Sequence, residues 1–132
     1  MGVKAIFLDR DGVINDGTLY YTYRKEDFKF NRGIFTGLRM LRDAGFIFIV
    51  ITNQAGVAKG IYTEKDVENL HAYMCDELKK RGIEIAAVYY CPHYPEISDP
   101  SHQPFPRKAA LSPQKVFHSH ILYHRKMHNI PY

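Results

Sequence analysis

Three apolar segments stand out along the chain: Val3–Leu8, Phe46–Ile51 and Glu84–Tyr90. Their β-branched and aromatic residues predict three β-strands. The middle segment is apolar without interruption, which is typical of a strand covered on both faces. Residues 12–31 are instead rich in Gly, Asn, Asp, Thr and Tyr, which predicts an irregular excursion after the first strand.

A first helical pattern follows this excursion. Ile34, Leu38 and Leu41 recur at helical spacing and would share one face of a helix. Asn31 precedes them as a candidate N-cap, and Gly45 follows them as a candidate terminator. The pattern therefore predicts a helix that begins shortly after Asn31 and ends before Gly45.

A second helical pattern lies before the third strand. Thr63 and Asp66 have the spacing of a capping box, which predicts a helix N-terminus at Thr63. Gly82 is a candidate for its end. The apolar face of this helix would consist of Val67, Leu70, Met74 and Leu78.

The order strand, helix, strand, helix, strand predicts an α/β fold. Parallel strands joined by right-handed crossovers would form a Rossmann-like, mostly parallel sheet in a three-layer sandwich. In such sheets ligands bind beyond the carboxyl ends of the strands. The residues that follow each predicted strand are therefore the candidate site residues.

Two aspartates follow the first strand. Asp9 and Asp11 can be directed at one small volume, and Gly12 lets the backbone turn behind them. Such a pair suits phosphoryl transfer, in which one carboxylate attacks phosphorus and the other supplies a proton to the leaving oxygen. Because two carboxylates repel a phosphate, this chemistry calls for Mg²⁺, which prefers oxygen ligands. A solvated turn uses the same residue types, so this segment alone leaves both interpretations open.

Polar residues follow the other two strands as well. Thr52 and Asn53 offer a hydroxyl and an amide that can bind phosphate oxygens without adding charge. Cys91 and His93 have the spacing of half a tetrahedral zinc site. Each segment taken singly also fits an ordinary loop, but three such strand ends in order are much more specific.

Composition fits a globular domain and sets the last part of the chain aside. The 132 residues are 45% hydrophobic and 24% charged, as in a single domain with its own core. No apolar run approaches the ~20 residues of a membrane span. Two cysteines, Cys75 and Cys91, are too few for a disulfide framework, which favours a reducing, cytoplasmic compartment. The net charge of +4 comes from residues 98–132, which also hold most of the histidines and prolines.

Taken together, the three strand ends resemble the haloacid-dehalogenase-like superfamily. The resemblance is carried by Ile6–Asn15, Ile51–Gly60 and Tyr89–Pro95. Within that superfamily these segments are most similar to the D-glycero-D-manno-heptose 1,7-bisphosphate 7-phosphatases, and the histidinol-phosphate phosphatases share much of the pattern. The resemblance covers about residues 3–96.

The resemblance implies a role for each matching residue. Asp9 would be the nucleophile that becomes an aspartyl-phosphate, and Asp11 the general acid and then the base that activates water. Mg²⁺ would be held by the Asp9 carboxylate and the Asp11 backbone carbonyl. Thr52, with Asn53 beside it, would bind the transferring phosphoryl group. Residues 12–31 would form a short flap next to the nucleophile.

The family's zinc loop is only half matched. Cys91 and His93 match the first two zinc ligands of a loop that helps to shape the substrate pocket. Pro104 and Pro106 stand where the family has its two closing cysteines. Because proline has no metal-binding side chain, we expect no complete zinc site of the family type.

The last part of the chain departs further from the family. Arg107 and Lys108 match a substrate contact and a phosphate-binding lysine, but no acidic residue follows Asp99, where the family supplies another Mg²⁺ ligand. Loss of a ligand weakens metal binding. A frameshifted or truncated reading of the coding sequence would produce such an abrupt departure from the family. We therefore divide the chain into a phosphatase core over residues 1–97 and a divergent basic tail, disordered or frameshifted, over residues 98–132.

The sequence thus predicts a Mg²⁺-dependent phosphomonoesterase of carbohydrate metabolism that removes one phosphate from a sugar bisphosphate. Three alternatives stay open: histidinol phosphate as the substrate, a phosphate-binding remnant impaired by the loss of the acidic Mg²⁺ ligand, and, least favoured, nucleic-acid binding through the basic tail. We expect a monomer that takes a phosphorylated small molecule and binds no membrane.

Overall fold

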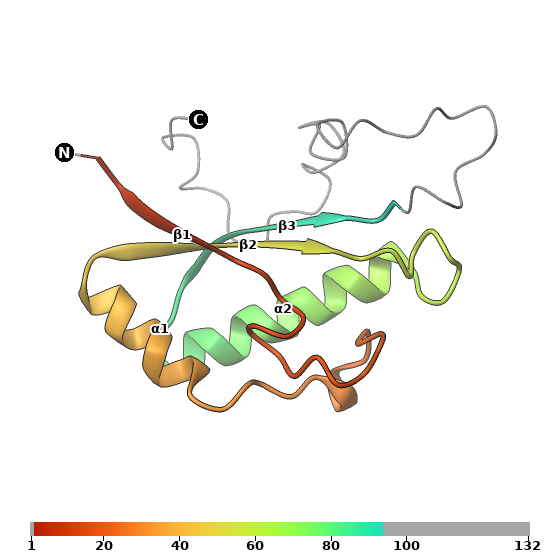
Figure 1. Ribbon diagram of the computed structural model, residues 1–132, viewed down its shortest axis with the longest axis horizontal. Helices are drawn as coiled ribbons and strands as arrows, with labels where there is room; N and C mark the ends of the chain where they lie inside the picture. The colour runs from red at the N-terminus through yellow and green to blue at the C-terminus, as the bar shows by residue number, and fades with distance from the viewer. Residues whose placement is uncertain (1, 94–132) are drawn as a thin grey trace.

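A computed structural model describes residues 2–93 of the chain (Figure 1). The strands are β1 (Lys4–Leu8), β2 (Phe46–Asn53) and β3 (Ile85–Cys91), and the helices are η1 (Lys25–Asp27, a 3₁₀ helix), α1 (Ile34–Asp43) and α2 (Glu64–Lys80). The predictions for Pro104, Pro106, Arg107 and Lys108, and the boundary near residue 98, lie outside the described residues.

The three strands form one parallel sheet in the order β1-β2-β3. Lys4 pairs with Phe46 at one end of the β1–β2 ladder, and Leu8 pairs with Val50 at the other. All three carboxyl ends therefore meet at the same edge of the sheet, where the candidate residues begin. The predicted parallel α/β fold is confirmed. Residues 2–93 contain two of the three predicted layers, the sheet and one layer of helices.

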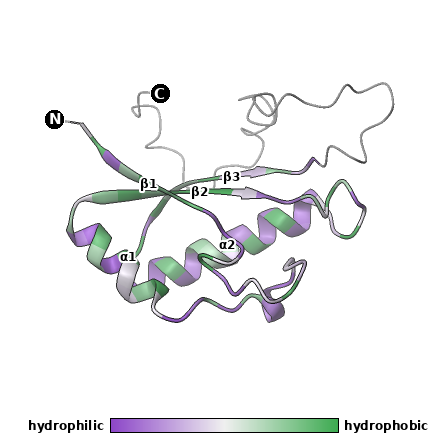
Figure 2. Cartoon of the chain, in the orientation of Figure 1, coloured by the Kyte–Doolittle hydropathy of each residue, from purple (hydrophilic) through white to green (hydrophobic). Residues whose placement is uncertain are grey.

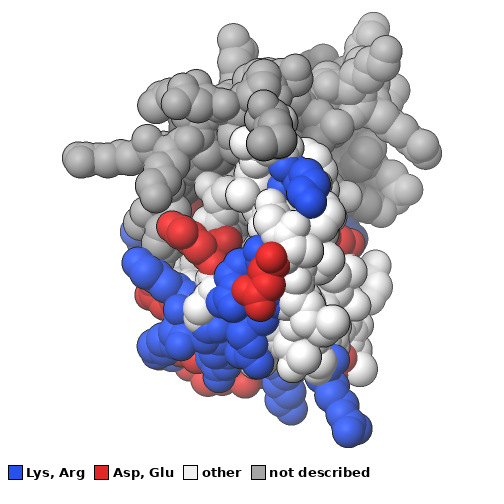
Figure 3. Space-filling view, turned by 90° about the vertical axis from the view of Figure 1, so that its left-hand side faces the viewer, with Lys and Arg blue, Asp and Glu red and all other residues white. Residues whose placement is uncertain are grey.

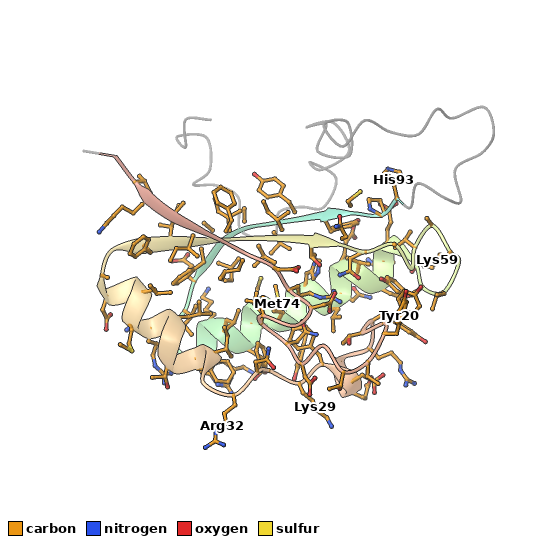
Figure 4. The ribbon with its side chains drawn as sticks, in the orientation of Figure 1. Tyr20, Lys29, Arg32, Lys59, Met74 and His93 are labelled. Atoms are coloured by element: carbon orange, nitrogen blue, oxygen red, sulfur yellow. The ribbon has the colours of Figure 1, made fainter. Side chains whose placement is uncertain are left out.

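Both helices cover the same face of the sheet, and the core lies between the two layers (Figure 1). Phe48 and Val50 of β2 pack with Leu38 of α1 and with Leu70 and Met74 of α2, all of them buried. Figure 2 shows the apolar residues along the strands, and Figure 4 shows Met74 between α2 and the sheet. Burial of each large apolar side chain contributes about 1.5–3 kcal/mol.

The predicted capping box opens α2. Thr63 Oγ1 accepts a hydrogen bond from the Asp66 backbone N at 3.1 Å, and the Asp66 carboxylate accepts one from the Thr63 backbone N at 2.9 Å. The helix ends at Lys80, and Gly82 follows in the left-handed region at φ 77°. The predicted apolar face is buried along its whole length.

The N-cap predicted for α1 is wrong. Gly33, at φ 82°, occupies the N-cap position, and no side chain caps the helix. The Asn31 side chain points to the excursion instead, where its Nδ2 donates to the carbonyls of Val13 at 3.0 Å and Asn15 at 3.2 Å. Asn31 therefore joins the two ends of the excursion, which the local cap pattern does not reveal.

Charges of both signs are mixed on the face seen from the left of Figure 1 (Figure 3). Pairs on the helices include Arg42 with Asp43 at 2.9 Å, and Glu77 with Lys80 at 2.8 Å and Arg81 at 3.1 Å. Exposed pairs of this kind contribute little to stability.

Among the described residues, no helix is both long and apolar enough to cross a membrane.

Candidate active site

Asp9 lies just beyond the carboxyl end of β1. Its side chain is exposed, and its Oδ1 accepts a hydrogen bond from the Arg10 backbone N at 2.8 Å. No other described residue bonds this carboxylate, so Oδ2 is available to a ligand. Alternation along the strand directs Arg10 the other way, to the helix-covered face, where it is fully buried.

The Asp11 carboxylate is held from two sides. Its Oδ1 accepts from Arg10 Nε at 3.2 Å, Arg10 Nη2 at 2.9 Å and Asn15 Nδ2 at 3.1 Å. Its Oδ2 accepts from Gln54 Nε2 at 3.1 Å. These donors fix the plane of a carboxylate whose side chain is still 39% exposed. Asp11 is therefore oriented and also accessible, as an acid–base group must be.

Arg10 is itself fixed by buried partners. Its Nη2 donates to the Thr22 carbonyl at 2.7 Å, and its Nη1 lies 3.2 Å from His71 Nε2. Burial, and secondarily the Arg10 charge, lower the pKa of His71 to about 3. Because the guanidinium can only donate, the neutral imidazole accepts at Nε2 and carries its hydrogen on Nδ1.

Gln54 joins the ends of β1 and β2. Its Nε2 bonds both Asp11 Oδ2 and Thr52 Oγ1, the latter at 2.9 Å, and its Oε1 accepts from the Tyr62 hydroxyl at 2.6 Å. Thr52 is buried at the end of β2, whereas Asn53 beside it is exposed. The structure therefore brings Thr52 and Asp11 into one hydrogen-bonded group.

The excursion packs beside this group as an irregular flap. The Tyr23 ring stacks on the Tyr62 ring, with centroids 5.0 Å apart. Lys59 Nζ donates to the Tyr21 hydroxyl at 2.9 Å and lies 5.8 Å from the centroid of the exposed Tyr20 ring (Figure 4). These contacts tie the flap to the loop after β2.

Cys91 is the last residue of β3, where the sequence places it. His93 follows two positions later, beyond the end of the strand (Figure 4). The Cys91 carbonyl accepts from the Gln54 backbone N at 2.8 Å, which ties this strand end to the loop after β2. Within residues 2–93, no three His, Cys, Asp or Glu side chains gather as a metal site. The zinc half-site stays a prediction.

Pattern and alternation indicate some of these partners but not others. The even positions of β1 and β2 face the helices, so the burial of Arg10, Thr52 and Gln54 follows from alternation. His71 lies on the apolar face of α2. Asn15 and Tyr62 come from irregular segments, where the sequence has no periodicity that could reveal them.

No family model matches the chain. Curated relatives do match it. The D-glycero-α-D-manno-heptose-1,7-bisphosphate 7-phosphatase of Photorhabdus laumondii is 44% identical over 94 residues, which is 71% of this chain and 51% of that protein. The D-glycero-β-D-manno-heptose-1,7-bisphosphate 7-phosphatase of Escherichia coli strain K12 is 42% identical over 94 residues, or 71% of this chain and 49% of that one. The chain is a homologue of these haloacid-dehalogenase-like phosphatases.

Solved structures show the same relationship. The D,D-heptose 1,7-bisphosphate phosphatase of B. bronchiseptica, complexed with magnesium and phosphate, superposes with a TM-score of 0.67 at 28% identity, over 78% of this chain and 57% of that one. The Burkholderia thailandensis phosphatase gives a TM-score of 0.52 at 31% identity, over 67% and 52%. The described residues therefore have the fold of this superfamily, although the chain spans about half the length of the curated relatives named above.

Proposed function

We propose that the chain is a phosphatase that removes the 7-phosphate from a heptose 1,7-bisphosphate. The observation that carries this proposal is the hydrogen-bonded link that Gln54 makes between Asp11 and Thr52. It lies at the same edge of the sheet as Asp9. An acid–base carboxylate and a phosphate-binding hydroxyl then lie in one group beside an accessible nucleophile. The names of the homologous phosphatases support the substrate class.

The reaction would proceed in two steps. In the first, Asp9 Oδ2 attacks phosphorus, the bond from phosphorus to the sugar oxygen breaks, and Asp11 gives that oxygen its proton. In the second, water attacks phosphorus, the bond from phosphorus to Asp9 Oδ2 breaks, and Asp11 accepts a proton from the water. Inorganic phosphate leaves, and Asp9 and Asp11 return to their starting states.

The donor set of this site fits Mg²⁺. The cation prefers oxygen ligands and commonly uses one or two carboxylates together with waters and phosphate oxygens. The Asp9 carboxylate and the Asp11 backbone carbonyl would hold it. When bound, it would offset the negative charge of the carboxylates and of the phosphate, and so allow the two to approach.

Phosphate release by the purified full chain tests the proposal. The chain should release inorganic phosphate from heptose 1,7-bisphosphate in the presence of Mg²⁺, and both anomers should be tried because the relatives named above differ in anomer. Asp9→Asn should lower the rate roughly a thousandfold or more, because it removes the nucleophile. Asp43→Asn, the same substitution at the far end of α1, should leave the rate unchanged. Turnover by Asp9→Asn would rule out Asp9 as the nucleophile.

A phosphate-binding remnant is the second candidate. It is favoured by one observation: no acidic residue follows Asp99, in the part of the sequence where the family supplies another Mg²⁺ ligand. Saturable binding of inorganic phosphate that depends on Mg²⁺, without turnover of the heptose bisphosphate or of histidinol phosphate, would identify this case. Turnover of histidinol phosphate alone would instead reassign the substrate.

A further inference from the structure

Every hydrogen-bonding atom of the Gln54 carboxamide has a partner. Nε2 carries two hydrogens, and its two acceptors are Asp11 Oδ2 at 3.1 Å and Thr52 Oγ1 at 2.9 Å. Oε1 accepts from the Tyr62 hydroxyl at 2.6 Å. A flipped carboxamide would place Oε1 against the Asp11 carboxylate. The Tyr62 hydroxyl therefore favours the one orientation in which all these groups are satisfied.

This orientation also determines what Thr52 can do. Its Oγ1 already accepts a hydrogen from Gln54. Its own hydroxyl hydrogen therefore points elsewhere and can be donated to a phosphate oxygen. A Thr52 hydroxyl that donated to Gln54 instead would have no hydrogen left for the phosphate.

The same network distinguishes the two oxygens of Asp11. Oδ1 accepts hydrogen bonds from Arg10 and Asn15, whereas Oδ2 accepts only from Gln54 among the described residues. A proton on Oδ1 would displace a charged donor. The proton that Asp11 delivers is therefore carried on Oδ2, the oxygen that Gln54 orients.

Packing holds Tyr62 where its hydroxyl can reach Gln54. The ring lies against Gly56, where a Cβ atom would collide with it, and it also stacks on the Tyr23 ring. The burial of Tyr62 raises the pKa of its phenol, so the hydroxyl stays protonated as a donor. The ring position thus sets the hydroxyl position.

We propose that Gln54, locked by Tyr62, is a positioning residue that couples the proton-carrying oxygen of Asp11 to the phosphate-binding hydroxyl of Thr52. This role rests on the proposed function. Gln54 acts through its two neighbours. Its loss should therefore slow the chemical step more than it weakens substrate binding.

Tyr62→Phe tests the lock with the smallest change, because it removes one hydroxyl and keeps the ring. We expect kcat for heptose 1,7-bisphosphate to fall about tenfold, the value of one buried hydrogen bond, with KM changed less than about twofold. Tyr90→Phe is the matched control, since Tyr90 is buried in the same cluster but bonds Glu64 instead. It should leave kcat unchanged.

A double-mutant cycle tests whether Tyr62 acts through Gln54. Gln54→Met keeps the volume and removes all three hydrogen bonds. In that background, Tyr62→Phe should cause no further loss of kcat, because the hydroxyl has lost its target. Losses that multiply in full would overturn the proposal. Urea unfolding of all four proteins checks that each is folded under the assay conditions.

A measurement without turnover keeps the two proposals separate. The Gln54 side-chain amide signals in a ¹H–¹⁵N spectrum are identified by their loss in Gln54→Met. Their hydrogens should exchange slowly with water in the wild-type chain and at least about tenfold faster in Tyr62→Phe. Exchange in the wild-type chain as fast as in a short peptide would overturn the positioning role. The chain could release no phosphate while the Gln54 amide still exchanges slowly in the wild type and faster in Tyr62→Phe. The proposed function would then be wrong, but the positioning of Gln54 by Tyr62 would be confirmed.

Discussion

The guanidinium of Arg10 donates two hydrogen bonds to a single oxygen of Asp11, from Nε at 3.2 Å and from Nη2 at 2.9 Å. The two residues are neighbours in the chain, yet the Arg10 side chain is 1% exposed and that of Asp11 is 39% exposed. The end of β1 thus turns one side chain into the core and leaves the other accessible. The Arg10 guanidinium, which is fixed in the core, therefore orients the carboxylate of Asp11, the candidate acid–base residue, from the buried side.

Arg10→Lys should destabilise the chain by about 1–3 kcal/mol, because an ammonium cannot reproduce the planar fork that reaches Asp11, Thr22 and His71 together. Urea unfolding measures the change. Arg24→Lys is the control, since Arg24 makes an exposed pair with Asp27 and its replacement should cost less than about 1 kcal/mol. Equal losses of stability in the two variants would show that the buried Arg10 guanidinium contributes no more to stability than the exposed one of Arg24.

The buried His71 predicts a pH dependence of stability. Its folded-state pKa of about 3 lies below the ordinary value of 6.5, so between these values the unfolded chain binds one more proton. The contribution of His71 to the free energy of unfolding is therefore fully present above pH 6.5 and falls as the pH is lowered, by at most about 1.4 kcal/mol per pH unit. Among the described residues, Arg10 and the Tyr90 ring face the imidazole.

His71→Gln provides the comparison for this titration, because an amide oxygen can still accept from Arg10 but does not titrate. Unfolding in urea at several values between pH 5 and 7 measures both proteins before most carboxylates protonate. The wild-type chain should lose stability more steeply than His71→Gln as the pH falls. Parallel curves would mean that His71 is protonated in the folded chain.

Hydrophobic patterning predicted the elements well, because apolar β-branched runs indicated the strands and helical spacing of apolar residues indicated α1 and α2. The strands predicted at Val3–Leu8 and Glu84–Tyr90 are observed at Lys4–Leu8 and Ile85–Cys91. The middle strand continues beyond its apolar run, because Thr52 and Asn53 still pair with β3. Polar residues at a strand end break the hydrophobic pattern without breaking the ladder of backbone hydrogen bonds.

The candidate site was predictable only in part. Asp9, Asp11 and Thr52 follow their strands directly, so parallel topology alone brings them to one edge. The donors that orient them do not follow from topology. Asn15 and Tyr62 come from irregular segments, and Asn31, which resembles a helix cap, instead joins the two ends of the flap. Their partners depend on loop paths that no short pattern encodes.

Thr63→Ala should lower the free energy of unfolding by about 1 kcal/mol, because it leaves the Asp66 backbone N–H at the start of α2 without its capping partner. Thr36→Ala makes the same change inside α1, where no cap is lost and alanine favours the helix, so it should not destabilise the chain. Thermal or urea unfolding distinguishes the two. A cost for Thr36→Ala as large as that for Thr63→Ala would contradict the capping assignment.

Gly56→Ala should affect both stability and catalysis, because a Cβ at this position collides with the Tyr62 ring. We expect a loss of about 1–3 kcal/mol from this overpacking. We also expect phosphate release to fall at least as far as in Tyr62→Phe, since displacement of the ring removes the hydroxyl from Gln54. Gly37→Ala is the control: it lies in α1 with no atom near its added Cβ, and it should stabilise the chain by up to about 1 kcal/mol without changing the rate. If Gly56→Ala kept the full rate, the position of the Tyr62 ring would not control Gln54, because a displaced ring cannot keep its hydroxyl on the carboxamide oxygen.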